Sequence, residues 1–395
     1  MPLSAVFHTS SLQKQVAALS DAFAIAGEFL HCDVINSGHI NMTFRATYRK
    51  PDGTTRRYGE CVAQGGHSRR YIFQRVNDAV FPCPRDVMHN VEKVTNHIRW
   101  KMLRVLKTPF RQTLNLYSAR GGRKYLEIPG SGFWRCYNCI ENTHTFDVAD
   151  HPRQAYEAAR AFGAFQQLLC DMNPEDIHET IPFFHHTRRR FDHLEKAAAA
   201  DSHGRLNTCR KELDFIRRRE RYVDVLLDLQ ERGELPVRIV HNDTKINNVM
   251  LDRETDKAVC VIDLDTVMPG SVLYDFGDMV RTMTSPAAED EENLDKTFLR
   301  MPMFEAVVKG YLKASREFIT PQEVSKLAFS GLLITLETGI RFLTDYLEGD
   351  VYFKTKKERH NLHRARTQLR LVESMEEQMP EMEECVRKCF QTVNG

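Results

Sequence analysis

The spacing of apolar residues changes partway along the chain, and this change restricts the possible folds more than any other feature. In the earlier part, apolar residues alternate in short runs such as 40–48 and 70–76, the period of a half-buried β-strand. From Pro152 onward, apolar residues recur every three or four positions over long stretches, as on the buried face of a helix. We therefore expect an α+β fold with two lobes, a strand-rich N-lobe over residues 1–145 and a mainly helical C-lobe over residues 146–395.

Local patterns predict the elements inside each lobe. In the N-lobe we expect a helix over 86–106 after the strand 70–76, a hairpin at Gly121-Gly122 and a strand over 133–140. The C-lobe contains a non-helical segment, 237–268. In this lobe we expect one helix that starts at Pro152 and further helices over 213–229, 304–318, 321–347 and 356–390.

The composition excludes several classes of protein. Hydrophobic residues make up 42% of the chain and charged residues 28%, which is typical of a globular protein and not of a disordered one. A net charge of +1 argues against a dedicated nucleic-acid binder. The longest apolar stretch, 327–343, contains Glu337 and Arg341, so we expect no membrane span. No signal peptide is evident at the N-terminus, and we expect a cytoplasmic protein.

The cysteine and histidine patterns do not favour a metal site. The ten cysteines are scattered, as expected in a reducing compartment, and the pair Cys136 and Cys139 lacks the second pair of a structural zinc site. His185, His186 and His193 have no carboxylate or cysteine at ligand spacing, so we interpret them as polar surface or structural residues.

The segment 237–270 carries the residues with a definite chemical pattern. A β-type run delivers His241 and Asp243 into a polar loop, a second short strand follows Asn248, and a third ends at Asp263. Strand, loop, strand, turn and strand predict that Asp243, Asn248 and Asp263 emerge near one another.

This set of side chains suits phosphoryl transfer. The reaction requires a carboxylate that orients and deprotonates an attacking hydroxyl, for which Asp243 is the candidate. It also requires oxygen ligands for Mg²⁺, for which Asn248 and Asp263 are the candidates. For Asp265, an auxiliary metal ligand and a polar structural residue are equally good interpretations.

The pattern His241-x-Asp243-x-x-x-x-Asn248 resembles the catalytic loop of protein kinases and of aminoglycoside- and choline-kinase-like phosphotransferases. Asp263 matches the metal-binding aspartate of the latter group. The resemblance implies a protein-kinase-like two-lobed fold, ATP as co-substrate and Mg²⁺ as cofactor. Asp275-Phe276-Gly277 has the letters of the protein-kinase metal motif, but it lies beyond the strand end, and we expect Asp275 to cap or anchor the following helix.

A second resemblance, to a more specific family within this group, extends over nearly the whole chain. The segments that resemble N-acetylhexosamine 1-kinases are Ser37–Thr43, His241–Asn248, Asp263–Gly270 and Arg341–Tyr352. This family implies transfer of the ATP γ-phosphate to the anomeric hydroxyl of GlcNAc or GalNAc, and the sequence does not distinguish the two sugars.

The expected nucleotide site lies in the N-lobe. Gly38 would let backbone N–H groups approach a phosphate, and His39, Asn41 and Thr43 would add donors. Kinases of related fold carry a lysine on the third strand, where this chain has Gln74.

The absent lysine changes the roles expected of other residues. Arg75 or His39 would have to neutralise the triphosphate, and Glu92 would lose its usual lysine partner, with a surface role as the alternative. The backbone of residues 134–140, where the lobes should join, is expected to contact adenine.

The expected acceptor site lies late in the chain. Arg341 interrupts an apolar helix, which is costly unless its charge meets a partner, and Tyr352 offers a flat face to a pyranose. Arg281 and Asp345 are weaker candidates, and a structural bridge between Arg341 and a carboxylate is the alternative. Two other functions stay open: a kinase for another small hydroxyl compound (an aminoglycoside, choline or homoserine), and a nucleotide-binding pseudokinase.

Overall fold

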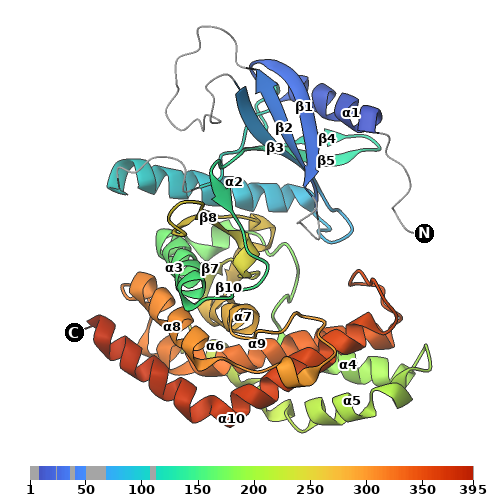
Figure 1. The fold of residues 1–395 in the computed structure, drawn as a ribbon, viewed down its shortest axis with the longest axis vertical. Helices are drawn as coiled ribbons and strands as arrows, with labels where there is room; N and C mark the ends of the chain where they lie inside the picture. The colour runs from blue at the N-terminus through green and yellow to red at the C-terminus, as the bar shows by residue number, and fades with distance from the viewer. Residues whose placement is uncertain (1–8, 24, 36–40, 50–67, 107–112, 395) are drawn as a thin grey trace. The chain divides into compact units, whose positions relative to one another are not determined.

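The computed structural model divides the chain into two compact units, drawn in Figure 1. It describes residues 9–23, 25–35, 41–49, 68–106 and 113–394. The first unit comprises Met1–Thr143, Ile177–Ile181 and Ile262–Asp265, and the second comprises His144–Asp176, Pro182–Val261 and Thr266–Gly395.

The first unit is built on an antiparallel five-stranded sheet in the order β1-β2-β3-β5-β4. Its strands are β1 (Glu28–Ile35), β2 (Met42–Arg49), β3 (Ser68–Val76), β4 (Leu126–Ile128) and β5 (Gly132–Asn138). Its helices are α1 (Thr9–Ala22) and α2 (Pro84–Lys101), and a short π-type turn, Met102–Leu106, continues α2. The α+β fold class and the helix after strand β3 are therefore confirmed.

The core of this unit lies between the sheet and α1. Phe44 and Phe73, on neighbouring strands, are fully buried in one cluster with Val16 of α1 and with Phe23, which directly follows α1. The sequence analysis missed α1 and β1. In β1 only Cys32 is buried, so the strand lacks the alternation that makes β2 and β3 recognisable.

The hairpin expected at Gly121-Gly122 is wrong. Strand β4 pairs with β5 through Leu126 and Trp134, across a turn that contains Gly130 at φ +73°. Gly121 and Gly122 instead form a local turn, in which the Gly122 N–H donates to the carbonyl of Ala119 at 2.8 Å. Glycine pairs indicate a turn but not which strands pair on either side of it.

The second unit contains the strands of the segment 237–270. They are β7 (Arg238–Val240), β8 (Val249–Asp252), β9 (Ala258–Val261) and β10 (Met268–Gly270). Strand β7 pairs with β10, and β8 pairs with β9 in a three-stranded sheet with β6 (Thr143–His144). The predicted order of strand, loop, strand, turn and strand is confirmed.

Helices form the rest of the second unit (Figure 1). They are α3 (Pro152–Leu169), α4 (Thr187–Ala200), α5 (Arg210–Arg217), α6 (Val225–Glu231), α7 (Val272–Met283), α8 (Met301–Ser315), α9 (Pro321–Leu347) and α10 (His360–Asn394). The single helix expected over 213–229 is wrong, because the turn Glu220–Tyr222 separates α5 from α6.

Helix α9 has the bounds expected from its apolar period. Thr320 and Glu323 form a capping box that fixes its start. In the described part of the chain, α9 is the one helix whose length and composition would also suit a membrane span, but most of its apolar window is buried inside the protein. Its apolar residues form the core of the helical unit, beside α7 and α10.

The cysteines in the described residues are free thiols. Cys260 is buried, whereas Cys170 is exposed just after α3. No cluster of histidine, cysteine and carboxylate side chains suited to a metal ion is found within the described ranges.

Candidate active site

Asp275, on the first turn of α7, holds the loop that follows β7. Its fully buried carboxylate accepts hydrogen bonds from the backbone N–H groups of His241 at 2.9 Å and Asn242 at 2.6 Å, and from Nε2 of Gln166 at 2.7 Å. Burial raises the pKa of Asp275, although these donors act against the rise. The expectation that Asp275 caps or anchors the following helix is corrected, since Ser271 caps α7 and Asp275 anchors the loop.

Further contacts fix the shape of this loop. Asn242 adopts a left-handed backbone at φ 64°, and its Nδ2 donates to the carbonyl of Thr266 at 2.9 Å. The buried ring of His241 lies edge-on to Phe162, and its Nδ1 accepts from the N–H of Asp243 at 3.3 Å. The contacts of His241 and Asn242 therefore fix the backbone that leads into Asp243.

Asp243 lies between a cation and an amide. Nζ of Lys245 is 2.9 Å from Oδ1 of Asp243, and Nδ2 of Asn248 donates to Oδ2 at 2.9 Å. Desolvation by the surrounding protein would raise the pKa of Asp243, but Lys245, His241 and Asn248 outweigh it and hold the pKa well below its usual range. The carboxylate is therefore ionised at neutral pH and available to accept a hydrogen bond from a hydroxyl group.

Asn248 has an orientation that suits a metal ligand. Its Nδ2 also donates to the carbonyl of Asp243 at 2.8 Å, so the amide nitrogen faces Asp243. The amide oxygen, the atom type that Mg²⁺ prefers, is therefore the end of the side chain directed away from Asp243.

Lys245 is a partner of Asp243 that the sequence analysis missed. Its position two residues after Asp243 was the available signal, because a cation so near in the chain can pair with the carboxylate. The pKa of Lys245 is raised by the charge of Asp243.

Arg281, a weaker acceptor candidate, is engaged by carboxylates. Its buried guanidinium donates to Oδ1 of Asp278 at 2.9 Å and to Oε1 of Glu289 at 3.2 Å. Burial would lower the pKa of Arg281, but these two carboxylates raise it. The charge of Arg281 is therefore balanced by two carboxylates of the protein.

In the first unit, a buried cluster surrounds Arg135 of β5. The guanidinium bonds to Oδ1 of Asp265, and its Nε and Nη2 donate to Oε1 of Gln74 at 3.1 and 2.9 Å. Oδ2 of Asp265 accepts from Nδ2 of Asn41 at 2.6 Å. Both oxygens of Asp265 are therefore used by the protein, which favours the structural interpretation of this residue over the metal ligand.

The predicted nucleotide residues lie around this cluster. Oγ1 of Thr43 accepts from Nε2 of Gln74 at 3.0 Å, and the carbonyl oxygen of the Asn41 side chain accepts from the N–H of Asn77 at 3.0 Å. Gly38 and His39 lie outside the described residues.

Among the described residues, the side-chain hydrogen bonds of Gln74 go to Thr43 and Arg135, and Arg75 and Glu92 have other surroundings. Arg75 lies on β3 opposite Trp134 of β5, and a Cβ at Gly132 would lie 3.0 Å from its Nε, so the glycine leaves room for this side chain. No contact of the Glu92 carboxylate with Gln74 is seen in the ranges that the structure describes.

Arg341 lies in an aromatic setting on α9. Its guanidinium is 5.0 Å from the ring centre of Phe184, 5.9 Å from Tyr352 and 5.5 Å from Phe353. The pKa of Arg190 is lowered by burial and by the charge of Arg341. A cavity of about 90 Å³ is lined by Arg190, His193, Arg341, Thr344, Asp345, Glu348, Tyr352 and Phe353.

The carboxylates at this cavity have partners in the protein. Oδ1 of Asp345 accepts from the N–H groups of Val351 at 2.9 Å and Tyr352 at 2.7 Å, which closes the loop after α9. Glu348 pairs with His193 at 2.7 Å. The cavity therefore presents cationic and aromatic groups to a ligand, and Tyr352 is 57% exposed beside it.

His185 is structural, as expected. Its Nδ1 is 2.8 Å from Oε1 of Glu337, whose other oxygen accepts from Oγ1 of Thr187 at 2.6 Å.

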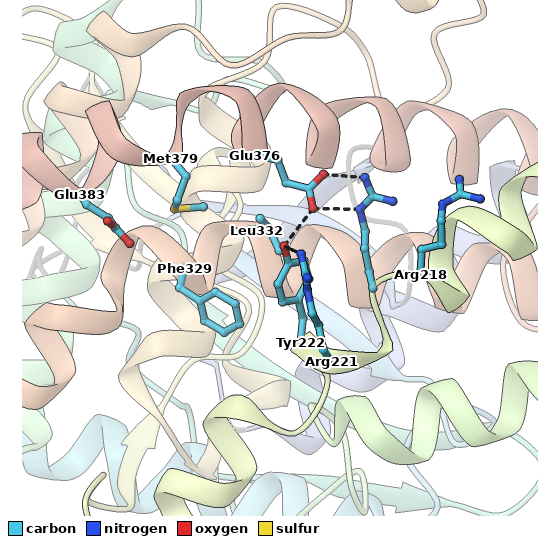
Figure 2. A pocket seen from close by; sticks show the side chains of 9 residues that line it. Arg218, Arg221, Tyr222, Phe329, Leu332, Glu376, Met379 and Glu383 are labelled. Carbon is cyan, nitrogen blue, oxygen red and sulfur yellow. Dashed lines mark hydrogen bonds and ion pairs between the residues drawn. The ribbon is translucent and has the colours of Figure 1, made fainter.

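A larger groove, of about 470 Å³, lies elsewhere on the helical unit. Figure 2 shows Phe329, Leu332 and Met379 between the side chains of Arg218 and Glu383. It contains none of the predicted site residues.

The two-lobed α+β fold and the loop with Asp243 define the class of phosphotransferases with a kinase-like fold. A family model described as "Phosphotransferase enzyme family" (APH) matches residues 63–306, and the chain belongs to this family.

Solved structures of similar fold are distant in sequence. An aminoglycoside phosphotransferase from Alicyclobacillus acidocaldarius matches with a TM-score of 0.55 and 12% identity over 96% of each chain. An ethanolamine kinase from Plasmodium vivax matches at 0.53 and 11% over 93% of this chain and 89% of that one. A microcompartment-associated aminopropanol kinase matches at 0.50 and 14% over 93% and 98%. At these identities the matches show the fold alone.

Proposed function

We propose that this protein is a cytoplasmic, ATP-dependent kinase that phosphorylates the anomeric hydroxyl of N-acetylhexosamines, GlcNAc or GalNAc. The observation that carries the kinase assignment is the ionised Asp243 held between Lys245 and Asn248. The acceptor assignment rests on the resemblance of 341–352 to N-acetylhexosamine 1-kinases and on the cavity beside Arg341.

Asp243 accepts a hydrogen bond from the acceptor hydroxyl and directs its oxygen toward the phosphoryl group. Because the pKa of Asp243 is low, the carboxylate is a weak base, and it takes the proton only as the new O–P bond forms. Lys245 supplies positive charge next to the transferred phosphoryl group, as this reaction requires.

The residues present also suit Mg²⁺. Asn248 would contribute its amide oxygen and Asp263 a carboxylate, both of the oxygen type that Mg²⁺ binds. Val249 of β8 pairs with Val261 of β9, and in the chain Asn248 directly precedes β8 while Asp263 lies two residues after Val261. When bound, the ion neutralises charge on the phosphate oxygens.

The chemistry of the cavity beside Arg341 argues against cationic acceptors. Aminoglycosides, choline and ethanolamine carry positive charges that would meet Arg190 and Arg341 in this cavity, where Oδ1 of Asp345 is used by backbone N–H groups. Arginine N–H groups and aromatic faces suit the hydroxyl groups and apolar face of a neutral sugar. A pseudokinase is disfavoured by the intact Asp243, Lys245 and Asn248.

The test is ADP release with Mg-ATP and a panel of GlcNAc, GalNAc, glucose, galactose, choline, ethanolamine, homoserine and kanamycin, followed by NMR of the product. We expect turnover on N-acetylhexosamines with phosphate at C1. Asp243→Asn should lower kcat by about 10²- to 10⁴-fold, whereas Asp256→Asn, a matched change in the turn after β8, should not. Turnover restricted to an amino alcohol or aminoglycoside would overturn the sugar assignment, and near-normal turnover of Asp243→Asn would overturn the role of Asp243.

A further inference from the structure

The segment Ile262–Asp265 follows β9 in the chain but belongs to the first unit. It contains Asp263, the carboxylate proposed for Mg²⁺, at a left-handed φ of 59°. Aspartate tolerates this backbone better than most residues, and the conformation sets the direction in which the side chain leaves the chain. The contacts that hold this segment in the first unit therefore bear on where the Asp263 carboxylate points.

Those contacts converge on Asp265. Its carboxylate bonds to Arg135 of β5 and accepts from Nδ2 of Asn41, and its carbonyl oxygen accepts from Oγ1 of Thr180 at 3.2 Å. Side-chain exposure is 1% for Arg135 and 2% for Asp265, so water does not compete for these bonds.

Arg135 is itself held in place by the sheet. Gln74 lies opposite Arg135 in the register of β3 and β5, and its Oε1 accepts from both Nε and Nη2. The guanidinium is also 5.0 Å from the ring centre of Tyr137, two residues along β5. The planar fork of arginine thus links two sheet strands to one carboxylate, a geometry that the single ammonium of lysine does not reproduce.

We propose that Arg135 is a positioning residue for metal binding: through Asp265 it fixes the segment that carries Asp263 and so orients the Asp263 carboxylate. This inference rests on the proposed function, because it takes Asp263 as a ligand of Mg²⁺. Arg135 does not contact the nucleotide in this proposal, since its donors are directed to Asp265 and Gln74 and its side chain is buried.

The test measures the affinity for ADP by calorimetry, with Mg²⁺ and with EDTA, on Arg135→Lys and wild type. Loss of an outer partner of a metal ligand lowers metal affinity by about 10- to 100-fold. We expect Arg135→Lys to reduce the gain in ADP affinity from Mg²⁺ by about 10-fold, with binding in EDTA unchanged. Arg70→Lys is the matched control, because Arg70 of β3 pairs with Glu141 in the same unit, away from Asp265.

A second variant separates positioning from folding. The double variant Arg135→Met with Asp265→Leu removes both charges together, which a folded protein tolerates better than loss of one. It should unfold cooperatively and show the same loss of Mg²⁺ dependence, also in direct titration with Mn²⁺ followed by electron paramagnetic resonance.

The two proposals fail in different ways. If wild type binds ADP equally with Mg²⁺ and with EDTA, the proposed function fails and this inference fails with it. If wild type shows the gain and both Arg135 variants match Arg70→Lys, only the positioning role is overturned.

Discussion

Two arginines, one in each unit, are withdrawn from water in different ways. Arg135 is almost fully buried, and its donors are used by the carboxylate of Asp265 and the amide of Gln74. Arg341 is half-buried over the rings of Phe184, Tyr352 and Phe353, and no ion pair of Arg341 with a carboxylate is seen among the described residues.

The difference separates a structural charge from one that is available to a ligand. A guanidinium bonded to a buried carboxylate has its hydrogen bonds satisfied and acts only on its neighbours. A guanidinium over aromatic faces keeps N–H groups at its edge for another acceptor. On this basis Arg135 organises the sheet unit, and Arg341 is the arginine that we assign to the acceptor.

The largest expected effect concerns stability. Arg135→Met leaves Asp265 buried without its cation, and loss of one partner of a buried pair costs about 3–5 kcal/mol. Arg341→Met removes aromatic contacts only, worth about 1–2 kcal/mol. Urea unfolding of both variants measures the difference, and equal losses would contradict the distinction between the two arginines.

The next effect concerns catalysis. Arg341→Met should lower kcat/KM for the sugar by about 10- to 100-fold, because the sugar loses a hydrogen bond to a charged donor. KM for ATP should stay unchanged. Arg219→Met is the control, because Arg219 also lies over a ring, that of Phe215, but pairs with Glu376, outside the segment 341–352. A comparable loss in the control would mean that Arg341 acts through packing alone.

A smaller effect is expected when the pH is lowered, because the ion pair of Asp243 and Lys245 then contributes less to the free energy of unfolding. The pKa of Asp243 in the folded protein lies well below the unfolded value of about 3.9, so the pair contributes stability above about pH 4 that is lost as the pH falls toward the folded pKa. The free energy of unfolding of wild type minus that of Asp243→Asn should be constant from pH 5 to 7 and shrink by about 1 kcal/mol at pH 3. A difference that stays constant down to pH 3 would show that the pKa is not lowered.

The smallest effect is expected at Glu92. Gln74 bonds to Arg135 and Thr43, so Glu92→Gln should change the free energy of unfolding by less than about 0.5 kcal/mol. KM for ATP should also be unchanged. A marked rise in KM would indicate that Glu92 takes part in nucleotide binding.

Much of the fold was predictable because local periodicity decided it. Helix α9 and the strands β2, β3 and β5 lie close to their expected positions, since each carries apolar residues at regular spacing in the sequence. The failures lie where burial is not periodic: β1 has one buried residue, and α5 and α6 are separated by a turn without glycine or proline. Their course depends on packing against distant segments.

The sequence by itself determined the two-lobed α+β class and the order of elements around Asp243, and it predicts the residues that we propose for phosphoryl transfer. These features follow from short-range spacing, because Asp243, Asn248 and Asp263 lie within one continuous segment of the chain. Only the tertiary structure decided that Asp275 anchors the loop from α7, and that Asp265 pairs with Arg135. Such partners are far apart in the chain, and a buried charge is stable only beside the group that folding brings to it.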